Sequence, residues 1–187
     1  MKRKRWWIAV SAAVLVVVVF LAGYAVGFDV ASPNVRISPM ATVEAMIDGS
    51  TVAVVYSRPY VRTREIFGAL LPYGRIWRMG ANEATTLSTE ADLVVAGRTV
   101  PAGDYTLYCI PDRGQWTLVI NRQTGQWGTQ YDESQDLLRV DMATESTADL
   151  VEQFTIRLES ATDGLAHTVE LIAEWENTRA RVTFELR

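Results

Sequence analysis

The sequence predicts an all-β fold, either an antiparallel β-sandwich or a barrel-like domain, with one short helix. Three observations lead to this prediction: apolar and polar residues alternate in short runs, turn-forming residues separate these runs, and only one segment has a helical pattern. Many short strands at regular spacing, with few helices, are typical of antiparallel sandwiches and barrels.

A hydrophobic segment precedes this domain. Residues 2–5 are all Lys or Arg, and residues 6–28 carry no charge and are rich in Val, Ala and Leu. A helix of this length is about 35 Å long, enough to cross the hydrocarbon layer of a membrane. Basic residues before an apolar span favour the cytoplasmic side, so we expect a transmembrane anchor with the remaining chain on the extracytoplasmic side. The alternative is a cleaved signal peptide, with Gly23 and Ala25 as a weak cleavage site and a secreted or periplasmic product.

The predicted organisation has three parts. Residues 1–28 form the basic N-terminus and the anchor or signal peptide, residues 29–39 form a polar linker that contains proline, and residues 40–187 form the β domain. Beyond residue 28 the chain has 14 basic and 22 acidic residues, a net charge of −8. This charge argues against a nucleic-acid partner. The single cysteine, Cys109, excludes an internal disulfide, so the core must supply the stability.

The domain's first half contains short predicted strands and the one predicted helix. The strands are Thr51–Tyr56, Ala84–Thr89, Asp92–Val95, Arg98–Val100, Gly103–Ile110 and Gln115–Asn121. The last two flank residues 111–114, Pro-Asp-Arg-Gly, which predict a tight turn and therefore a hairpin. The predicted helix is Thr63–Leu71, with Thr63 as its N-terminal cap and Pro72 after its end.

The second half contains three runs in which apolar and polar residues alternate: residues 153–159, 169–175 and 181–186. Residues 176–179, Glu-Asn-Thr-Arg, lie between the last two runs and predict a turn, and hence a C-terminal hairpin. Alternation also predicts one shared core, with these inward-facing residues: Trp116, Leu118, Ile120, Phe154, Ile156 and Leu158.

An unusual string of residues follows the first strand. It consists of Tyr56-Ser-Arg-Pro59, Phe67-Gly68, Pro72-Tyr-Gly74 and Trp77-Arg-Met-Gly-Ala-Asn-Glu-Ala-Thr85, and it continues in Pro101-Ala-Gly103, Trp116, Asn121 and Trp175-Glu176. In this string the chain resembles the bacterial family known as domain of unknown function 2911, from Ser38 to the C-terminus. The resemblance implies a mostly β domain that is often exported, and it implies no activity.

The same stretch is rich in arginine and aromatic residues. Guanidinium groups bind carboxylates and phosphates, and aromatic rings stack on sugars or other ligands. We therefore predict a site for an anionic or sugar-like ligand, formed by Tyr56, Arg58, Tyr60, Arg64, Trp77, Arg78, Asn82 and Glu83. In the alternative interpretation each arginine pairs with a local carboxylate, and the aromatic residues fill the ends of the sandwich.

These observations favour a ligand- or partner-binding module of the cell envelope over an enzyme. One alternative is a hydrolase of envelope carbohydrate that uses Glu83 as acid or base, which would need two carboxylates about 5–10 Å apart in one cleft. A purely structural envelope component is the other. With His167 as the only histidine and Cys109 as the only cysteine, we predict neither a metal site nor a cofactor. The sequence assigns no catalytic residue and no oligomeric state.

Overall fold

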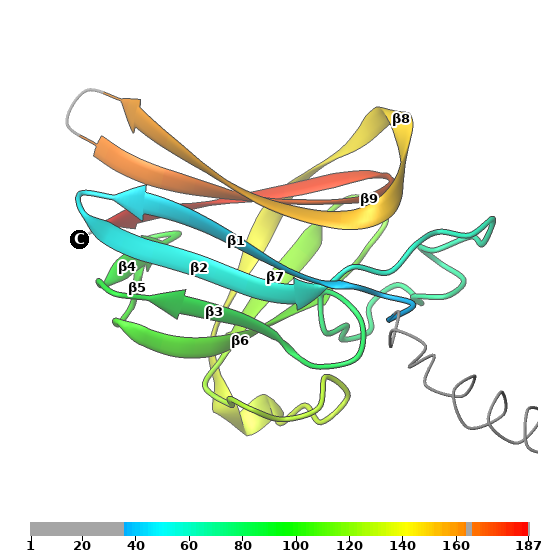
Figure 1. Cartoon of the computed structure of the whole chain (residues 1–187), viewed down its shortest axis with the longest axis horizontal. Coiled ribbons are helices and arrows are strands. Elements are labelled where there is room, and N and C mark those ends of the chain that lie inside the picture. Colours follow the sequence, from blue (N-terminus) through cyan, green and yellow to red (C-terminus); the bar gives the residue numbers. More distant parts are fainter. Residues whose placement is uncertain (1–35, 164–165, 187) are drawn as a thin grey trace, which may run out of the picture. The chain divides into compact units, whose positions relative to one another are not determined.

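The computed structural model describes residues 36–163 and 166–186, and the regular structure in this part of the chain is almost entirely antiparallel β-strand (Figure 1). The strands are β1 (Met40–Ile47), β2 (Ser50–Ser57), β3 (Thr85–Thr89), β4 (Leu93–Val95), β5 (Arg98–Val100), β6 (Gly103–Ile110), β7 (Trp116–Asn121), β8 (Asp136–Asp163) and β9 (Ala166–Leu186). A single turn of 3₁₀ helix, η1 (Glu133–Gln135), precedes β8. The all-β prediction is confirmed.

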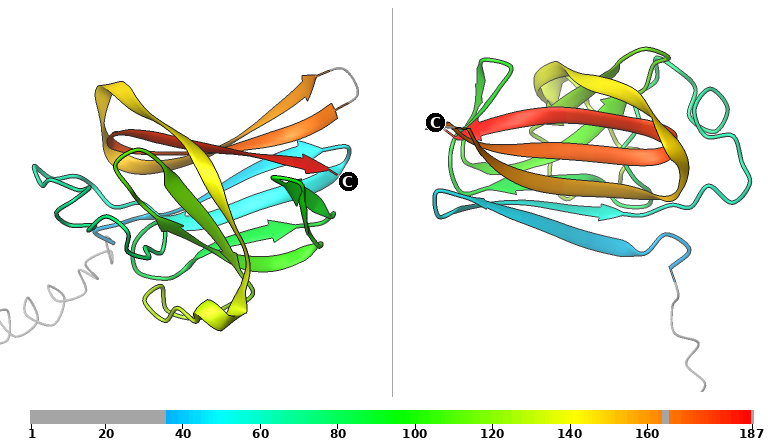
Figure 2. Two further views of the ribbon diagram at one scale, coloured as in Figure 1. Left: turned by 180° about the vertical axis from the view of Figure 1, so that it is seen from behind. Right: turned by 90° about the horizontal axis from the view of Figure 1, so that it is seen from above.

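The strands form one sheet that folds over on itself. Their order is β1-β2-β3-β6-β7-β8-β9-β4-β5. The long strand β8 belongs to both halves: its first residues pair with β7 up to Met142, and from Ala143 onward it pairs with β9. The second half of β8 and β9 therefore form a layer that lies over β1, β2, β3 and β6 (Figures 1 and 2).

The strands predicted in the first half of the domain correspond to β2–β7. The hairpin of β6 and β7 has the expected turn, because Ile110 pairs with Thr117 across residues 111–114. Alternate residues of both strands belong to the core between the layers, and Tyr108 and Val119 on the opposite face are buried as well.

The chain reverses where the C-terminal turn is predicted. Both ends of β9 lie on the same side of the domain (Figure 1), so residues 166–175 and 180–186 run in opposite directions, and Arg179 binds Glu174 across the turn. Glu176 has a left-handed φ of 54°. Ser146 pairs with Thr178 and Val151 with Glu176, so β8 carries extra residues at this point and its register with β9 shifts there.

The helix predicted at residues 63–71 is wrong. Gly68, in the middle of this segment, has a φ of 94°, which a right-handed helix cannot contain, and its N–H donates forward to the carbonyl oxygen of Leu71. The N–H groups of Ile66 and Phe67 donate to the carboxylate of Glu176, 110 and 109 residues away in the sequence. The segment is therefore a loop whose backbone is held by β9.

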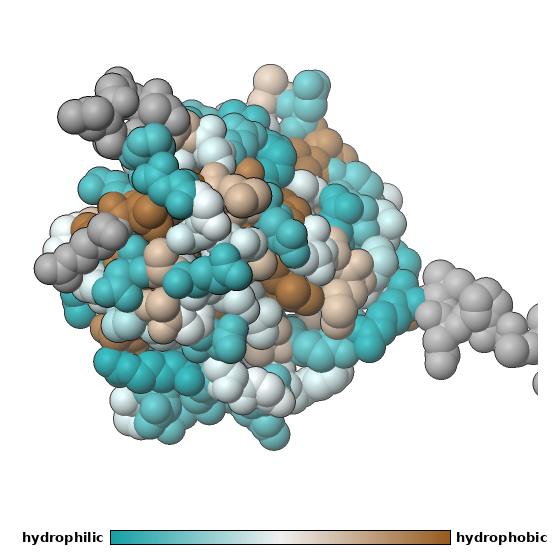
Figure 3. All heavy atoms as spheres, turned by 60° about the vertical axis from the view of Figure 1, so that its left-hand side comes forward, coloured by the Kyte–Doolittle hydropathy of each residue, from teal (hydrophilic) through white to brown (hydrophobic). Residues whose placement is uncertain are grey.

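The core between the layers is one cluster with a centre of aromatic side chains. Trp116, Leu118, Ile120, Phe154 and Ile156 are buried in this cluster as predicted, and Leu158 is partly buried against it. Trp77 and Trp175 stack with ring centroids 5.7 Å apart, and Phe154 lies 5.0 Å from Trp77. The face shown in Figure 3 has hydrophobic residues only in small separate groups between hydrophilic ones.

The predicted membrane segment, residues 6–28, lies outside the described residues. Within residues 36–163 and 166–186, no helix has the length and hydrophobicity needed to cross a membrane. The predicted linker is described only from Arg36, and β1 begins at Met40.

Candidate functional site

A cavity of about 330 Å³ opens where two irregular loops meet β9. The first loop follows β2, the second precedes β3, and β9 supplies Trp175. The residues that line the cavity are Ile37, Ser38, Pro59, Tyr60, Arg62, Arg64, Leu70, Leu71, Trp77, Arg78, Gly80, Ala81 and Trp175. Its volume is at the lower end of the range of small-molecule sites, which is roughly 300–1,000 Å³.

The stacked indole rings of Trp77 and Trp175 form part of the cavity wall. Trp77 donates from Nε1 to the carbonyl oxygen of Gly80, at 3.0 Å. Trp175 is only 1% exposed, and its Nε1 has no hydrogen-bond partner among the described residues. A buried indole N–H without an acceptor is costly, and most such groups in proteins have a partner.

Three guanidinium groups line the same cavity. The stem of Arg78 is half-buried, its Nε is buried without a described partner, and burial lowers the pKa of this side chain. Arg64 donates from Nε and Nη2 to the carbonyl oxygens of Val61 and Tyr60, so Nη1 is its free end within the described structure. The guanidinium of Arg62 lies 5.8 Å from the centroid of the Tyr60 ring, a cation–π contact.

No carboxylate lines this cavity in the described part of the chain. The ion pairs of arginine in the described residues all involve arginines outside the cavity, at positions 36, 139, 157, 179 and 181. The cavity is therefore a local concentration of positive charge in a domain whose net charge is −8. Uncompensated like charges at close range repel each other, and an anion between them removes this cost.

The first loop is held by carboxylates at both ends. Glu152 of β8 accepts the N–H of Arg62 at 3.0 Å, and Glu176 of β9 accepts the N–H of Ile66 at 3.1 Å. These bonds fix the backbone that carries Arg62, Arg64, Leu70 and Leu71. Glu152 and Glu176 thus bind backbone groups of this loop, and the described residues show no ion pair of Arg62, Arg64 or Arg78.

The second loop is held by the body of the sheet. Trp77 exchanges two backbone hydrogen bonds of 2.7 Å with Cys109 of β6, and the hydroxyl of Thr85 donates to the carbonyl oxygen of Met79. Met79 and Asn82 have left-handed φ values of 52° and 59°. The loop is therefore a fixed, non-repeating structure that positions Arg78 before any ligand arrives.

Gly128 lies against the stem of Arg78. A methyl group added at Gly128 would be 2.1 Å from Cδ of Arg78 and 2.8 Å from the carbonyl oxygen of Asn82. Only a residue without a side chain leaves room for Arg78 in this position. No sequence signal marks Gly128, because the contact joins segments that only the fold brings together.

The predicted site residues fall into three groups. Tyr60, Arg64, Trp77 and Arg78 line the cavity together. The other four lie elsewhere: Tyr56 is in the core, Arg58 follows β2 and binds β8, and Asn82 and Glu83 are in a neighbouring surface depression with Arg36 and Trp127. Ile37 and Ser38 line both the cavity and this depression, so the two are adjacent.

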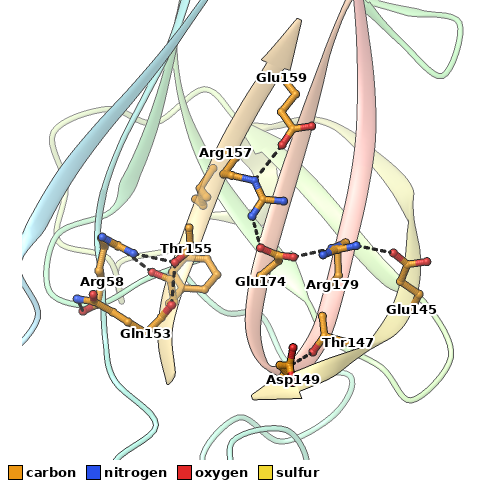
Figure 4. A network of polar contacts seen from close by, with 12 residues as sticks. Arg58, Glu145, Thr147, Asp149, Gln153, Thr155, Arg157, Glu159, Glu174 and Arg179 are labelled. Atoms are coloured by element: carbon orange, nitrogen blue, oxygen red, sulfur yellow. Dashed lines mark hydrogen bonds and ion pairs between the residues drawn. The ribbon is translucent and has the colours of Figure 1, made fainter. Parts of the chain in front are cut away.

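Tyr56 and Arg58 connect the two layers. The hydroxyl of Tyr56 accepts the N–H of Ile156 at 2.8 Å and donates to the carbonyl oxygen of the same residue, and burial raises its pKa. Arg58 donates to the carbonyl oxygen of Phe154 and to the hydroxyl of Thr155, at 3.1 and 2.7 Å (Figure 4). Their polar groups are thus used within the protein.

Glu83 forms an ion pair with Arg36 at 2.8 Å. A hydrogen bond from its own backbone N–H and the contact with Arg36 lower its pKa, so this carboxyl stays ionised at neutral pH. The arrangement gives Glu83 a partner of its own, and no second carboxylate lines the depression within the described structure.

Sequence reasoning did not assign Trp175, Glu176 or Arg62 to the site. Trp175 and Glu176 are part of the string on which the family resemblance rests, and that string was the available signal.

The remaining candidates are Cys109 and His167. Cys109 is fully buried, and burial raises the pKa of its thiol well above the ordinary value. Nδ1 of His167 lies 3.1 Å from Oδ1 of Asp48. The described residues contain no group of three or more His, Cys, Asp or Glu side chains that could hold a metal ion.

The structure thus defines a class of protein: an all-β domain with a cationic cavity whose wall is aromatic. The comparison with known families assigns it further. The chain belongs to the family described as Protein of unknown function (DUF2911), which matches residues 38–184. Neither a curated protein nor a solved structure matches the chain.

Proposed function

We propose that this protein is a binding module for a small anionic ligand, and that the cavity beside Arg62, Arg64 and Arg78 is its site. One observation carries the proposal: Arg62, Arg64 and Arg78 line one cavity, and no carboxylate lines it within the described residues. An anion in the cavity would compensate this charge.

The hydrolase alternative has less support. A general acid needs a raised pKa, whereas the pKa of Glu83 is lowered by its backbone N–H and by Arg36. A glycosidase also needs a second carboxylate across the cleft, and none lines the cavity or the depression in residues 36–163 and 166–186. These features favour a binding protein over a carbohydrate hydrolase.

The proposed site is tested by the thermal stability of the full-length chain with and without phosphate, sulfate and acidic sugars. An anion at 100 times its Kd should stabilise the parent by about 2.7 kcal/mol, a rise in Tm of roughly 5–10 °C. Arg78→Met, which keeps an apolar stem, should lose this response. Arg75→Met is the matched control, because Arg75 is exposed, lies in the same segment and does not line the cavity. If no anion changes the Tm of the parent, the proposal is wrong.

We further propose that the domain works outside the cytoplasm, attached to the membrane by residues 6–28 or released after cleavage of this segment. The basic residues 2–5 before the apolar run support this orientation. A reporter fused after Arg187 should be active only in its extracytoplasmic form. Activity of a reporter that works only in the cytoplasm would contradict the proposed location.

A further inference from the structure

We infer that the ligand is an amphiphilic monocarboxylate, a single carboxylate attached to an apolar chain or ring. This inference rests on the proposed function and narrows it to one chemical class. It follows from the apolar part of the cavity and from the small number of donors that the arginine residues leave free.

The first argument is the apolar wall. Pro59, Leu71 and the Trp77 ring line the cavity beside the arginine residues. At its opening, Leu70 is 45% exposed and Ile37 is 69% exposed. These two side chains come from different segments of the chain. Large apolar side chains that remain exposed beside a polar site gain free energy when an apolar group covers them, about 25 cal/mol per Å².

The second argument is the number of available donors. Two of the guanidinium nitrogens of Arg64 already bind backbone carbonyl groups, and Arg62 lies over the Tyr60 ring. The arginine residues therefore leave few guanidinium nitrogens for a ligand, and a carboxylate has only two oxygens to satisfy. A compact dianion such as phosphate needs more donors around its oxygens, and Pro59, Leu71 and Trp77 make part of the cavity wall apolar.

The third argument is the combination of burial and charge. The part of the cavity wall formed by Trp77 and Trp175 is apolar and almost fully buried. A strongly hydrated inorganic anion would lose much of its hydration there, whereas an organic carboxylate also brings apolar surface that favours entry.

The test uses the full-length chain in lipid nanodiscs and isothermal titration calorimetry, with empty nanodiscs as the blank. The probes are 3-phenylpropanoate, acetate, inorganic phosphate and the uncharged 3-phenylpropanol. We expect 3-phenylpropanoate to bind at least tenfold more tightly than each of the other three. Leu70→Asn should weaken its binding about three- to tenfold. The matched control is Leu150→Asn, because Leu150 is 54% exposed and lies outside the cavity, and it should leave the affinity unchanged.

Each outcome separates the inference from the proposed function. If phosphate binds as tightly as 3-phenylpropanoate, the site is anionic but the ligand class is wrong. If the neutral alcohol binds as tightly as the carboxylate, both the ligand class and the proposed anion site are wrong. If none of the four probes binds, both proposals fail. Equal losses in Leu70→Asn and Leu150→Asn would show that Leu70 does not contact the probe, which overturns the inference.

Discussion

Replacement of Gly128 by alanine should displace Arg78 from the cavity. Carbon atoms in contact prefer a separation of about 3.5–4.0 Å, and the added methyl group would lie 2.1 Å from Cδ of Arg78. The stem of Arg78 must therefore move by about 1.4 Å or more. The added methyl group is also crowded by backbone, because the carbonyl oxygens of Asn82 and Glu83 would lie 2.8 and 3.0 Å from it.

Two measurements follow from this displacement. Overpacking should lower the free energy of unfolding by about 1–3 kcal/mol in denaturant titrations. Loss of the charge-assisted hydrogen bond from Arg78, worth about 1.5–3 kcal/mol, should weaken the binding of 3-phenylpropanoate about 10- to 100-fold. Gly114→Ala is the control, because a methyl group at Gly114 meets no atom within 4 Å. If Gly128→Ala keeps both the stability and the affinity of the parent, Arg78 is not held by this contact and the reasoning is refuted.

Two further predictions concern the stability of the layers. Glu174 is 5% exposed and binds Arg157 and Arg179 (Figure 4). Burial alone would raise the pKa of its carboxyl. The hydrogen bonds from the two arginines outweigh burial, so the pKa is lowered. The two ion pairs of Glu174 stabilise the fold at neutral pH, and this stability is lost as the pH falls below about 4.5 through the folded-state pKa. Glu174→Gln should therefore lower the free energy of unfolding by about 2–4 kcal/mol at pH 7, and the difference from the parent should shrink in acid. A difference that stays constant from pH 7 to pH 3 would contradict this assignment. Trp116→Ala should cost about 3–5 kcal/mol, because the residue is 1% exposed and packs against Phe67; a loss under roughly 1 kcal/mol in urea unfolding would exclude Trp116 from the core.

The strands could be predicted because their signal is local. In β6 and β7 the alternation and the intervening Pro-Asp-Arg-Gly turn depend only on neighbouring residues, and the observed register follows from them. The loop at residues 63–71 has a local pattern typical of a helix, but Glu176 binds its N–H groups from β9. The polar run at residues 176–179 indicates a turn, and the chain reverses there. The error at residues 63–71 arises where a distant segment supplies hydrogen bonds that no local pattern predicts.

The candidate site also combines residues that the sequence alone indicates with residues that only the fold reveals. Its arginine and aromatic residues between positions 60 and 78 could be found from composition alone, because they are concentrated in one stretch. Tyr56 and Arg58 belong to that stretch but lie where β2 meets β8, and their polar groups are used there. Trp175 and Gly128 lie far from the stretch in sequence. Both reach the site through contacts with segments that are distant in the sequence, and such contacts leave no periodic pattern.

The hydrogen bonds from Ile66 and Phe67 to Glu176 also affect how the chain folds during its synthesis. The Glu176 carboxylate binds the backbone of Ile66, which leaves the ribosome 110 residues earlier. At synthesis rates of about 5–20 residues per second, the loop waits roughly 5–20 s for its partner. During this time Phe67 and Trp77 have no Trp175 to pack against, so their apolar surface is available to other chains. The arrangement that fixes the cavity in the finished protein therefore exposes the nascent chain to aggregation, and it makes the last strand the step that completes the site.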